Sequence, residues 1–151
     1  GWSDASAARA VAHRLRDVGV QVLRNQVTEI GGLQLAGLDD LWAGRFAPHE
    51  VLPRIDRSEA SLVLSHNPDT LDAPGWDDWQ GWVLSGHTHG GQCKPPFLPP
   101  PLLPVRNRRY TRGAFSARGG RRVYINAGLG FLRQVRFNVR PEVTVFTLRR
   151  A

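Results

Sequence analysis

The sequence contains a single cysteine, Cys93, and no methionine. One cysteine cannot form an intrachain disulfide, which excludes the small disulfide-stabilised scaffolds of many secreted proteins. No apolar run approaches the ~18–20 residues that a membrane-spanning helix needs. The first residues carry neither an initiator methionine nor the charged and then apolar pattern of an export signal. We therefore expect a piece of a longer protein, whose targeting stays open between the cytoplasm and a membrane.

Acidic residues are almost missing from the second part of the chain. Residues 1–90 carry 12 acidic residues and 7 arginines, whereas residues 91–151 carry 13 basic residues and one acid, Glu142. A basic segment favours partners that bear phosphate, because arginine binds phosphate in a bidentate manner. A solvated basic surface explains the same bias, so both interpretations stay open.

Helical and strand patterns are mixed along the 151 residues, which predicts one α/β domain. We expect a helix from a cap at Ser3 or Asp4 to Val18, with a buried stripe of Val11, Leu15 and Val18. A second short helix is expected over 48–55. The expected strands are 20–23, 33–38, 61–65, 81–85, 112–116, 121–125 and 143–148, with glycine turns at Gly31-Gly32 and Gly119-Gly120.

Three histidines follow apolar runs of this sequence. His66 comes after the strand pattern of 61–65, and His87 and His89 come after that of 81–85. Open α/β sheets bind ligands at the ends of their strands, and neutral imidazole is a common metal ligand. We expect the three rings to converge on a metal if the two strands are neighbours. The alternative is that they are ordinary loop or core residues with hydrogen-bond partners.

Other motifs allow a functional and a structural interpretation. Cys93 could be a soft metal ligand, but a buried structural thiol is expected. The proline-rich loop over 94–104 either packs on the body or contacts a lipid or apolar ligand. The tryptophans at 76, 79 and 82 form either a packed aromatic patch or a substrate wall. The glycine-rich loop over 126–130 is either a turn or a buttress of the site, and arginines over 106–112 either are solvated or clamp a phosphate.

Three segments resemble the calcineurin-like metallophosphoesterases: Leu64-Ser65-His66-Asn67-Pro68-Asp69, Leu84-Ser85-Gly86-His87-Thr88-His89-Gly90-Gly91-Gln92 and Tyr124-Ile125-Asn126-Ala127-Gly128-Leu129-Gly130. The nearest subgroup is bacterial and includes membrane-associated phosphodiesterases and hydrolases similar to those that act on UDP-2,3-diacylglucosamine. The resemblance implies a two-sheet β-sandwich flanked by helices. It also implies two divalent metal ions (Mn, Zn, Fe or Mg), with His66 and His87 on one ion and His89 on the other.

The same resemblance leaves part of the family pattern unmatched. The family's Asp-x-His, Gly-Asp-x-x-Asp and Gly-Asn-His-Asp motifs do not occur in these residues. Residues 1–151 therefore resemble the C-terminal part of the domain, and no catalytic residue can be assigned to them. Without the missing carboxylates, three neutral imidazoles do not offset the charge of two divalent ions, so we expect weak metal binding and little activity from these residues alone.

The implied function is hydrolysis of a phosphodiester or phosphomonoester by metal-bound hydroxide. The implied substrate is a phosphate ester, with a lipid or nucleotide–lipid precursor as a candidate, and membrane association is open. A specific nucleic-acid partner is not expected from the resemblance. Two alternatives remain. One is a non-catalytic basic module over 106–150 that binds nucleic acid or an anionic membrane. The other is a small protein that binds one metal through His66, His87 and His89.

Overall fold

The computed structural model describes residues 5–131 and 134–149. Its α-helices are α1 (Ala5–Asp17) and α2 (Pro48–Val51), and its strands are β1 (Gln26–Ile30), β2 (Leu33–Gly37), β3 (Ser61–Leu64), β4 (Trp82–Ser85), β5 (Gly113–Ser116) and β6 (Arg122–Ile125). Four 3₁₀ segments connect them: η1 (Leu52–Arg54), η2 (Pro68–Asp72), η3 (His89–Gly91) and η4 (Arg118–Gly120). The expected cap at Ser3 or Asp4 lies outside the described residues.

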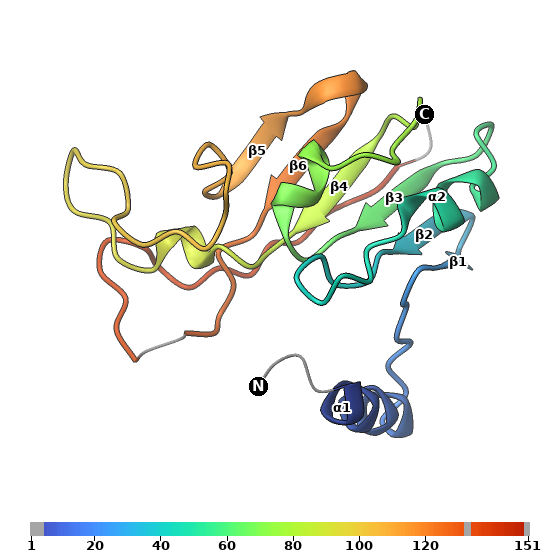
Figure 1. Ribbon diagram of the computed structural model, residues 1–151, viewed down its shortest axis with the longest axis horizontal. Helices are drawn as coiled ribbons and strands as arrows, with labels where there is room; N and C mark the ends of the chain where they lie inside the picture. The colour runs from blue at the N-terminus through green and yellow to red at the C-terminus, as the bar shows by residue number, and fades with distance from the viewer. Residues whose placement is uncertain (1–4, 132–133, 150–151) are drawn as a thin grey trace.

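One mixed sheet organises the described residues, in the strand order β1-β2-β3-β4-β6-β5 (Figure 1). The four central strands run parallel, and a hairpin partner closes each edge in the antiparallel direction. The prediction of an α/β fold is therefore confirmed. The two-sheet sandwich is not confirmed, because a single sheet accounts for every strand in the described part of the chain.

The turns between paired strands follow the expected glycine chemistry. Gly31 and Gly32 both have positive φ values, 59° and 83°, as a tight turn between β1 and β2 requires. Gly119 and Gly120 also have positive φ values where the chain passes from β5 to β6. Both hairpins are therefore confirmed, and their positions were set by residues that tolerate a left-handed backbone.

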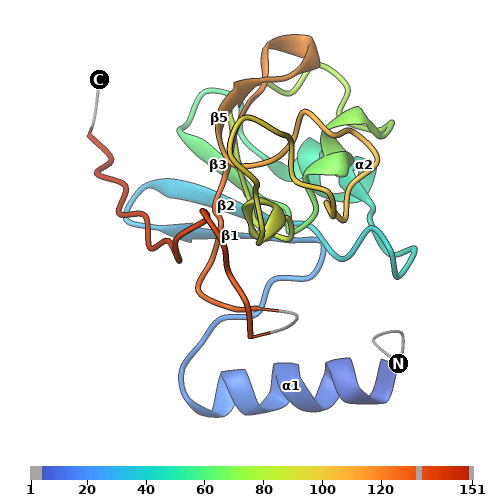
Figure 2. The ribbon, with the colours of Figure 1, turned by 90° about the vertical axis from the view of Figure 1, so that its left-hand side faces the viewer.

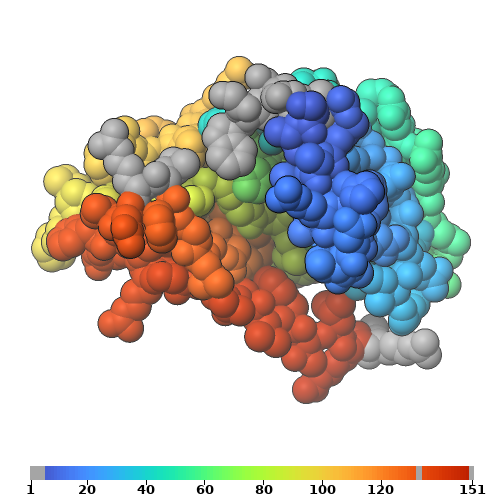
Figure 3. All heavy atoms as spheres, turned by 90° about the horizontal axis from the view of Figure 1, so that it is seen from below, coloured from blue at the N-terminus to red at the C-terminus, as the bar shows by residue number. Residues whose placement is uncertain are grey.

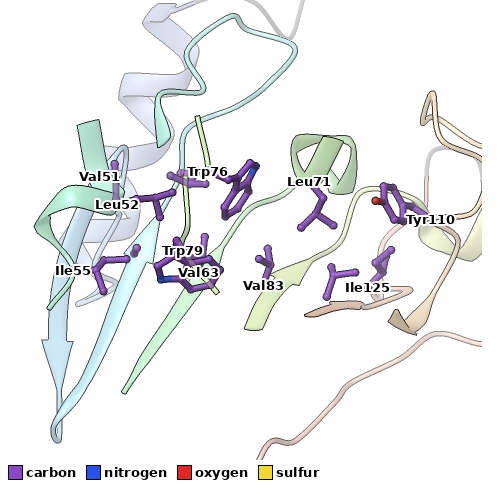
Figure 4. Close-up of a cluster of buried hydrophobic side chains, with 13 residues drawn as sticks. Val51, Leu52, Ile55, Val63, Leu71, Trp76, Trp79, Val83, Tyr110 and Ile125 are labelled. Carbon is purple, nitrogen blue, oxygen red and sulfur yellow. The ribbon is translucent and has the colours of Figure 1, made fainter. Parts of the chain in front are cut away.

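The core lies on one face of the sheet. Alternate residues of the central strands, Ala36, Val63, Val83 and Val123, are paired in register and are fully buried. Ile125 of β6 joins them, and the segments that follow β2, β3 and β4 cover them with Val51, Leu52, Ile55, Leu71, Trp76, Trp79 and Tyr110 (Figure 4). Trp76 and Trp79 are 2% and 1% exposed, with ring centroids 5.8 Å apart. The prediction of a packed aromatic patch is confirmed for this pair.

The opposite face of the sheet is also apolar but is less covered. Leu62 and Trp82 pair in register there, and the next row holds Leu64, Leu84 and Tyr124. Leu64 is 37% exposed and the others are half-buried. Seen from below, α1 and the C-terminal segment lie in front of the strands (Figure 3), and α1 stands apart from the β1–β2 hairpin (Figure 2).

Three expectations about individual segments were wrong. The stripe of Val11, Leu15 and Val18 is exposed, because no strand packs against that side of α1 in the described structure. Residues 20–23 form no strand. Leu23 instead packs across Gly37, where an added Cβ would lie 2.3 Å from the Leu23 Cβ. Residues 143–148 form no strand either. Side-chain hydrogen bonds of Glu142 and Thr144, rather than a backbone ladder, hold the start of this segment to Tyr124 of β6 and to Asn126 and Ala127 just after it.

Candidate metal centre

The candidate site lies where β2, β3 and β4 end side by side. These strands are parallel neighbours, so their carboxyl ends meet at one edge of the sheet. His66 follows β3 and His87 follows β4, and the Gly86 amide donates to the His66 carbonyl at 3.0 Å. The expectation that the two histidine-bearing strands are neighbours is confirmed, and backbone pairing continues past the strands as far as the histidines.

The rings of His66 and His87 are in direct contact. The His66 Nε2 lies 3.2 Å from the His87 Nδ1, and the ring centroids are 5.0 Å apart. The His87 Nε2–H donates to the Pro104 carbonyl at 2.8 Å, and since a carbonyl only accepts, Nε2 carries the proton. In neutral His87 the Nδ1 lone pair therefore points at His66. Trp42 braces the other side of the His87 ring, with centroids 4.4 Å apart.

Both imidazoles are held toward the neutral form that binds metals. Desolvation lowers the pKa of His66 and outweighs the opposing charge of Asp40, and His89 lowers it further. Desolvation also lowers the pKa of His87, followed by repulsion from His66, against the raising effects of the Pro104 carbonyl, Asp40 and Asp69. Neutral rings keep their lone pairs free near neutral pH, as metal ligands must.

His89 lies near this pair but does not touch it. It has a φ of 50°, and its Nδ1 faces Gln92 Oε1 at 3.4 Å. Among the described residues, no hydrogen bond or ring contact joins His89 to His66 or His87, and no group of three or more His, Cys, Asp or Glu side chains is arranged as a metal site. The metal site of His66, His87 and His89 therefore stays a prediction, and its described geometry is that of the first two rings.

The facing nitrogens of His66 and His87 fit one ion. Two ligands at ~2.1 Å from an ion, with an angle of about 100° between them, have nitrogens ~3.2 Å apart, and 3.2 Å is the separation found here. The hydrogen bond from His87 to the Pro104 carbonyl is the kind of outer contact that fixes ligand histidines. Two imidazoles are an incomplete ligand set, so further ligands or water must complete it.

Several residues of the site were given no role in the sequence predictions. Asp40 acts on the pKa of both histidines from just beyond β2, and Trp42 contacts His87. Asp69, at 8% exposure, accepts the backbone amides of Arg106 at 2.7 Å and Asn107 at 3.0 Å, which fastens the end of the proline-rich loop near His87. The acidic pair Asp39-Asp40 directly after a predicted strand was a sequence signal that could have identified Asp40. No sequence signal indicated that Asp69 would bind the amides of Arg106 and Asn107, an interaction that we call the Asp69 clamp.

The remaining sequence motifs are mainly structural. Cys93 is half-buried, so the expected buried thiol was wrong in its burial, because the segment over 92–94 runs along the surface beside Phe137. Asn126 accepts the Gly128 amide at 2.6 Å and donates to Thr144, as a turn requires. The proline-rich loop has no regular structure over 94–104, as expected. In the described residues, no helix is long and apolar enough to span a bilayer.

Several curated relatives of the chain are bacterial metallophosphoesterases. The chain is 39% identical over 142 residues to phosphodiesterase YaeI of Escherichia coli, which covers 91% of this chain and 51% of that protein. It is 39% identical over 122 residues to the metallophosphoesterase YkuE of Bacillus subtilis, covering 78% of the chain and 41% of YkuE. It is 33% identical over 141 residues to the UDP-2,3-diacylglucosamine pyrophosphatase LpxG of Chlamydia trachomatis, covering 85% of the chain and 41% of LpxG.

These similarities show that the chain belongs to the calcineurin-like metallophosphoesterases, which are metal-dependent hydrolases. The chain spans about half the length, or less, of these curated relatives. No family model matches the sequence. No solved structure matches it either.

Proposed function

We propose that this chain is part of a metal-dependent phosphoesterase whose metal ligands include His66, His87 and His89. The contact between His66 Nε2 and His87 Nδ1 at 3.2 Å carries this proposal, because it brings two neutral donors from separate strand ends within the reach of one ion. The metallophosphoesterase relatives support the same chemistry.

Two divalent ions, when bound, would polarise a phosphate ester and supply a nucleophile from water. The residues of this chain would orient that centre. The Pro104 carbonyl holds the His87 ring so that Nδ1 faces inward, and Trp42 limits its rotation. Asp69 anchors the segment that carries Pro104 by accepting two backbone amides. Asp40 adds negative charge near both rings, which favours bound cations.

The names of the relatives indicate the substrate class in general terms. One relative is named a phosphodiesterase, and another is named for a diacylated sugar nucleotide. We propose a phosphate ester as the substrate, with a lipid or nucleotide–lipid precursor as the first class to test.

The apolar back of the sheet supports a larger domain. Leu62, Leu64 and Leu84 lie on the face that the core does not use and remain partly exposed. A second sheet against this face would bury them and complete a β-sandwich. The resemblance implies that part of the family's domain, with the Asp-x-His and Gly-Asn-His-Asp motifs, is not matched by this sequence.

The test compares hydrolysis of bis(p-nitrophenyl) phosphate with added Mn²⁺ by this chain and by a form extended toward the N-terminus. We expect turnover only in the extended form, and we expect His87→Ala to lower the turnover rate of that form at least a hundred-fold. An exposed histidine of α1, His13, provides the control His13→Ala, which should keep full turnover. Equal turnover in both forms would contradict the missing-carboxylate argument, and an active His87→Ala would contradict the metal ligand assignment.

A further inference from the structure

Large apolar side chains protrude at the end of the molecule that carries the proline-rich loop. Phe97 is fully exposed at 105%, Leu102 is 81% exposed and Leu98 is 60% exposed. Phe97 also has a φ of 63°, which is unfavourable for a bulky residue and is not offset here by burial. An exposed phenylalanine held in this backbone conformation needs a reason beyond the packing of the chain itself.

A second exposed apolar group lies beside the base of this loop. Phe131, Val135 and Phe137 are 55–59% exposed. Their segment is paired with the loop, because the Lys94 amide donates to the Phe137 carbonyl at 2.9 Å and the Phe137 amide donates to the Gln92 carbonyl at 3.0 Å. The two segments lie side by side at one end of the ribbon (Figure 1). We call Phe97, Leu98, Leu102, Phe131, Val135 and Phe137 the apolar end.

The loop that carries Phe97 is fastened to the body. Pro100 packs so closely on Gly91 that an added Cβ there would lie 2.2 Å from the Pro100 Cβ. The Arg108 guanidinium donates to the Pro100 carbonyl at 2.6 Å, and the prolines stiffen the backbone between these contacts. The apolar side chains are therefore presented outward on a fixed support, because the loop can fold back over them only by breaking these contacts.

The stretch of sequence that carries the apolar end is basic. Residues 79–141 contain no acidic residue, and Lys94, Arg106 and Arg109 belong to the same loop or its return. Arg106 and Arg109 are exposed. The acids nearest this return, Asp69 and Asp72, are already bound by the amides of Arg106 and Asn107 and by the Asn107 and Tyr110 side chains. These neutral donors leave both carboxylates charged, but no ion pair joins Arg106 or Arg109 to an acid within the described residues.

We propose that the apolar end docks on an anionic lipid bilayer, with Phe97, Leu98 and Leu102 entering the interface and Arg106 and Arg109 binding lipid phosphates. A fully exposed phenylalanine with exposed leucines and arginines in the same segment suits the interface of an anionic bilayer, which accepts apolar side chains without a matching cavity. Aliphatic and phenylalanine side chains gain free energy by leaving water, and each nearby arginine adds attraction to an anionic surface. A nucleic acid would use the arginines and leave the apolar tip in water.

Docking in this way would turn the candidate site toward the membrane. Pro104 ends the same loop and holds His87 by a 2.8 Å hydrogen bond. A lipid-borne phosphate ester could then reach the histidines without leaving the bilayer surface. This last consequence rests on the proposed function. Docking itself is tested by vesicle binding, which does not require the chain to hydrolyse any substrate.

The test is co-sedimentation of the full chain with vesicles of phosphatidylcholine alone and with 30% phosphatidylglycerol added. We expect binding to the anionic vesicles that weakens with salt. Phe97→Ser with Leu102→Ser should weaken it at least ten-fold, because two apolar side chains are withdrawn from the interface. Arg106→Gln and Arg109→Gln should each weaken it about five-fold.

Matched controls come from the other end of the chain. Ile30→Ser removes a 58% exposed apolar side chain in the β1–β2 hairpin, and Arg14→Gln removes an exposed arginine of α1. Both should bind vesicles like the unmodified chain. Absence of binding to anionic vesicles would overturn the proposal. So would binding that the arginine substitutions weaken and the Phe97 and Leu102 substitutions do not, since that pattern describes a purely ionic surface such as one for nucleic acid. A chain that is dimeric without vesicles, becomes monomeric with Phe97→Ser and binds no vesicles would assign the apolar end to a second copy.

Discussion

The carboxylate of Asp69 offers the sharpest structural test, because one buried group holds two distant amides. Asp69 is 8% exposed and accepts from Arg106 at 2.7 Å and from Asn107 at 3.0 Å. Hydrogen bonds to a charged group contribute about 1.5–3 kcal/mol each. Asp69→Asn keeps one acceptor oxygen but turns an amide NH₂ toward the second backbone N–H. One bond is therefore lost and one donor is left facing another.

We expect Asp69→Asn to lower the free energy of unfolding by about 2 kcal/mol. With a urea m-value of about 2 kcal/mol per molar, the midpoint of urea unfolding moves down by ~1 M. Asp77→Asn is the control, because Asp77 is exposed with no hydrogen bond recorded for its side chain within the described residues, and its midpoint should not move measurably. A loss below about 0.5 kcal/mol in Asp69→Asn would refute the clamp.

A second measurement tests whether Asp69 positions His87 in addition to stabilising the fold. Arg106 follows Pro104 by two residues, and Pro104 orients His87 through the 2.8 Å hydrogen bond. In folded Asp69→Asn we expect the His87 ring resonances to broaden or shift, as followed by NMR of the histidine side chains. Unchanged His87 resonances together with a lowered midpoint would mean that Asp69 stabilises the loop without positioning the histidine.

Three further outcomes are expected. His66→Ala should weaken Zn²⁺ binding by the chain at least ten-fold in calorimetric titration, whereas His13→Ala should not, and equal affinities would count against the histidine pair. Burial and the hydrogen bond to Asp72 raise the pKa of Tyr110 to about 12, so above pH 10 the unfolded chain loses this proton before the folded chain does. The free energy of unfolding of the wild type should therefore fall by about 2–3 kcal/mol between pH 10 and 12, relative to that of Tyr110→Phe. Parallel pH profiles of the two proteins would contradict this. Trp79→Ala should cost about 3–5 kcal/mol in thermal or urea unfolding, because the ring is 1% exposed, and a smaller loss would mean that the core collapses around the gap.

The sequence was informative where a residue's position follows from local chemistry. Glycine pairs located both hairpins, and apolar runs located β3 and β4 to within one residue. Because parallel strands share an edge, the positions of His66 and His87 after two such runs were enough to predict their meeting. The position of His89 was less determined, since it lies in a tight loop whose backbone geometry no periodicity describes.

Predictions failed where the outcome depends on a distant partner. The alternation over 143–148 resembles a strand, but a strand needs a neighbour with free backbone groups, and Glu142 and Thr144 are bound to β6 by side chains instead. The stripe on α1 correctly indicated a helix with one apolar side and gave no information on what covers it. The clamp by Asp69 spans 37 residues, beyond any local pattern.

Two kinds of exposed apolar surface in this chain call for different partners. The back of the sheet is a regular row of leucines such as Leu62 and Leu84 on adjacent strands, spaced to meet another sheet face about 10 Å away. Phe97 instead lies on the proline-rich loop together with exposed Leu98 and Leu102, in a stretch without acids. We expect a folded neighbour that buries the leucines to leave Phe97 in solvent. Vesicle binding should accordingly survive in an extended form whose sheet is covered, and should be lost only when the loop itself is changed.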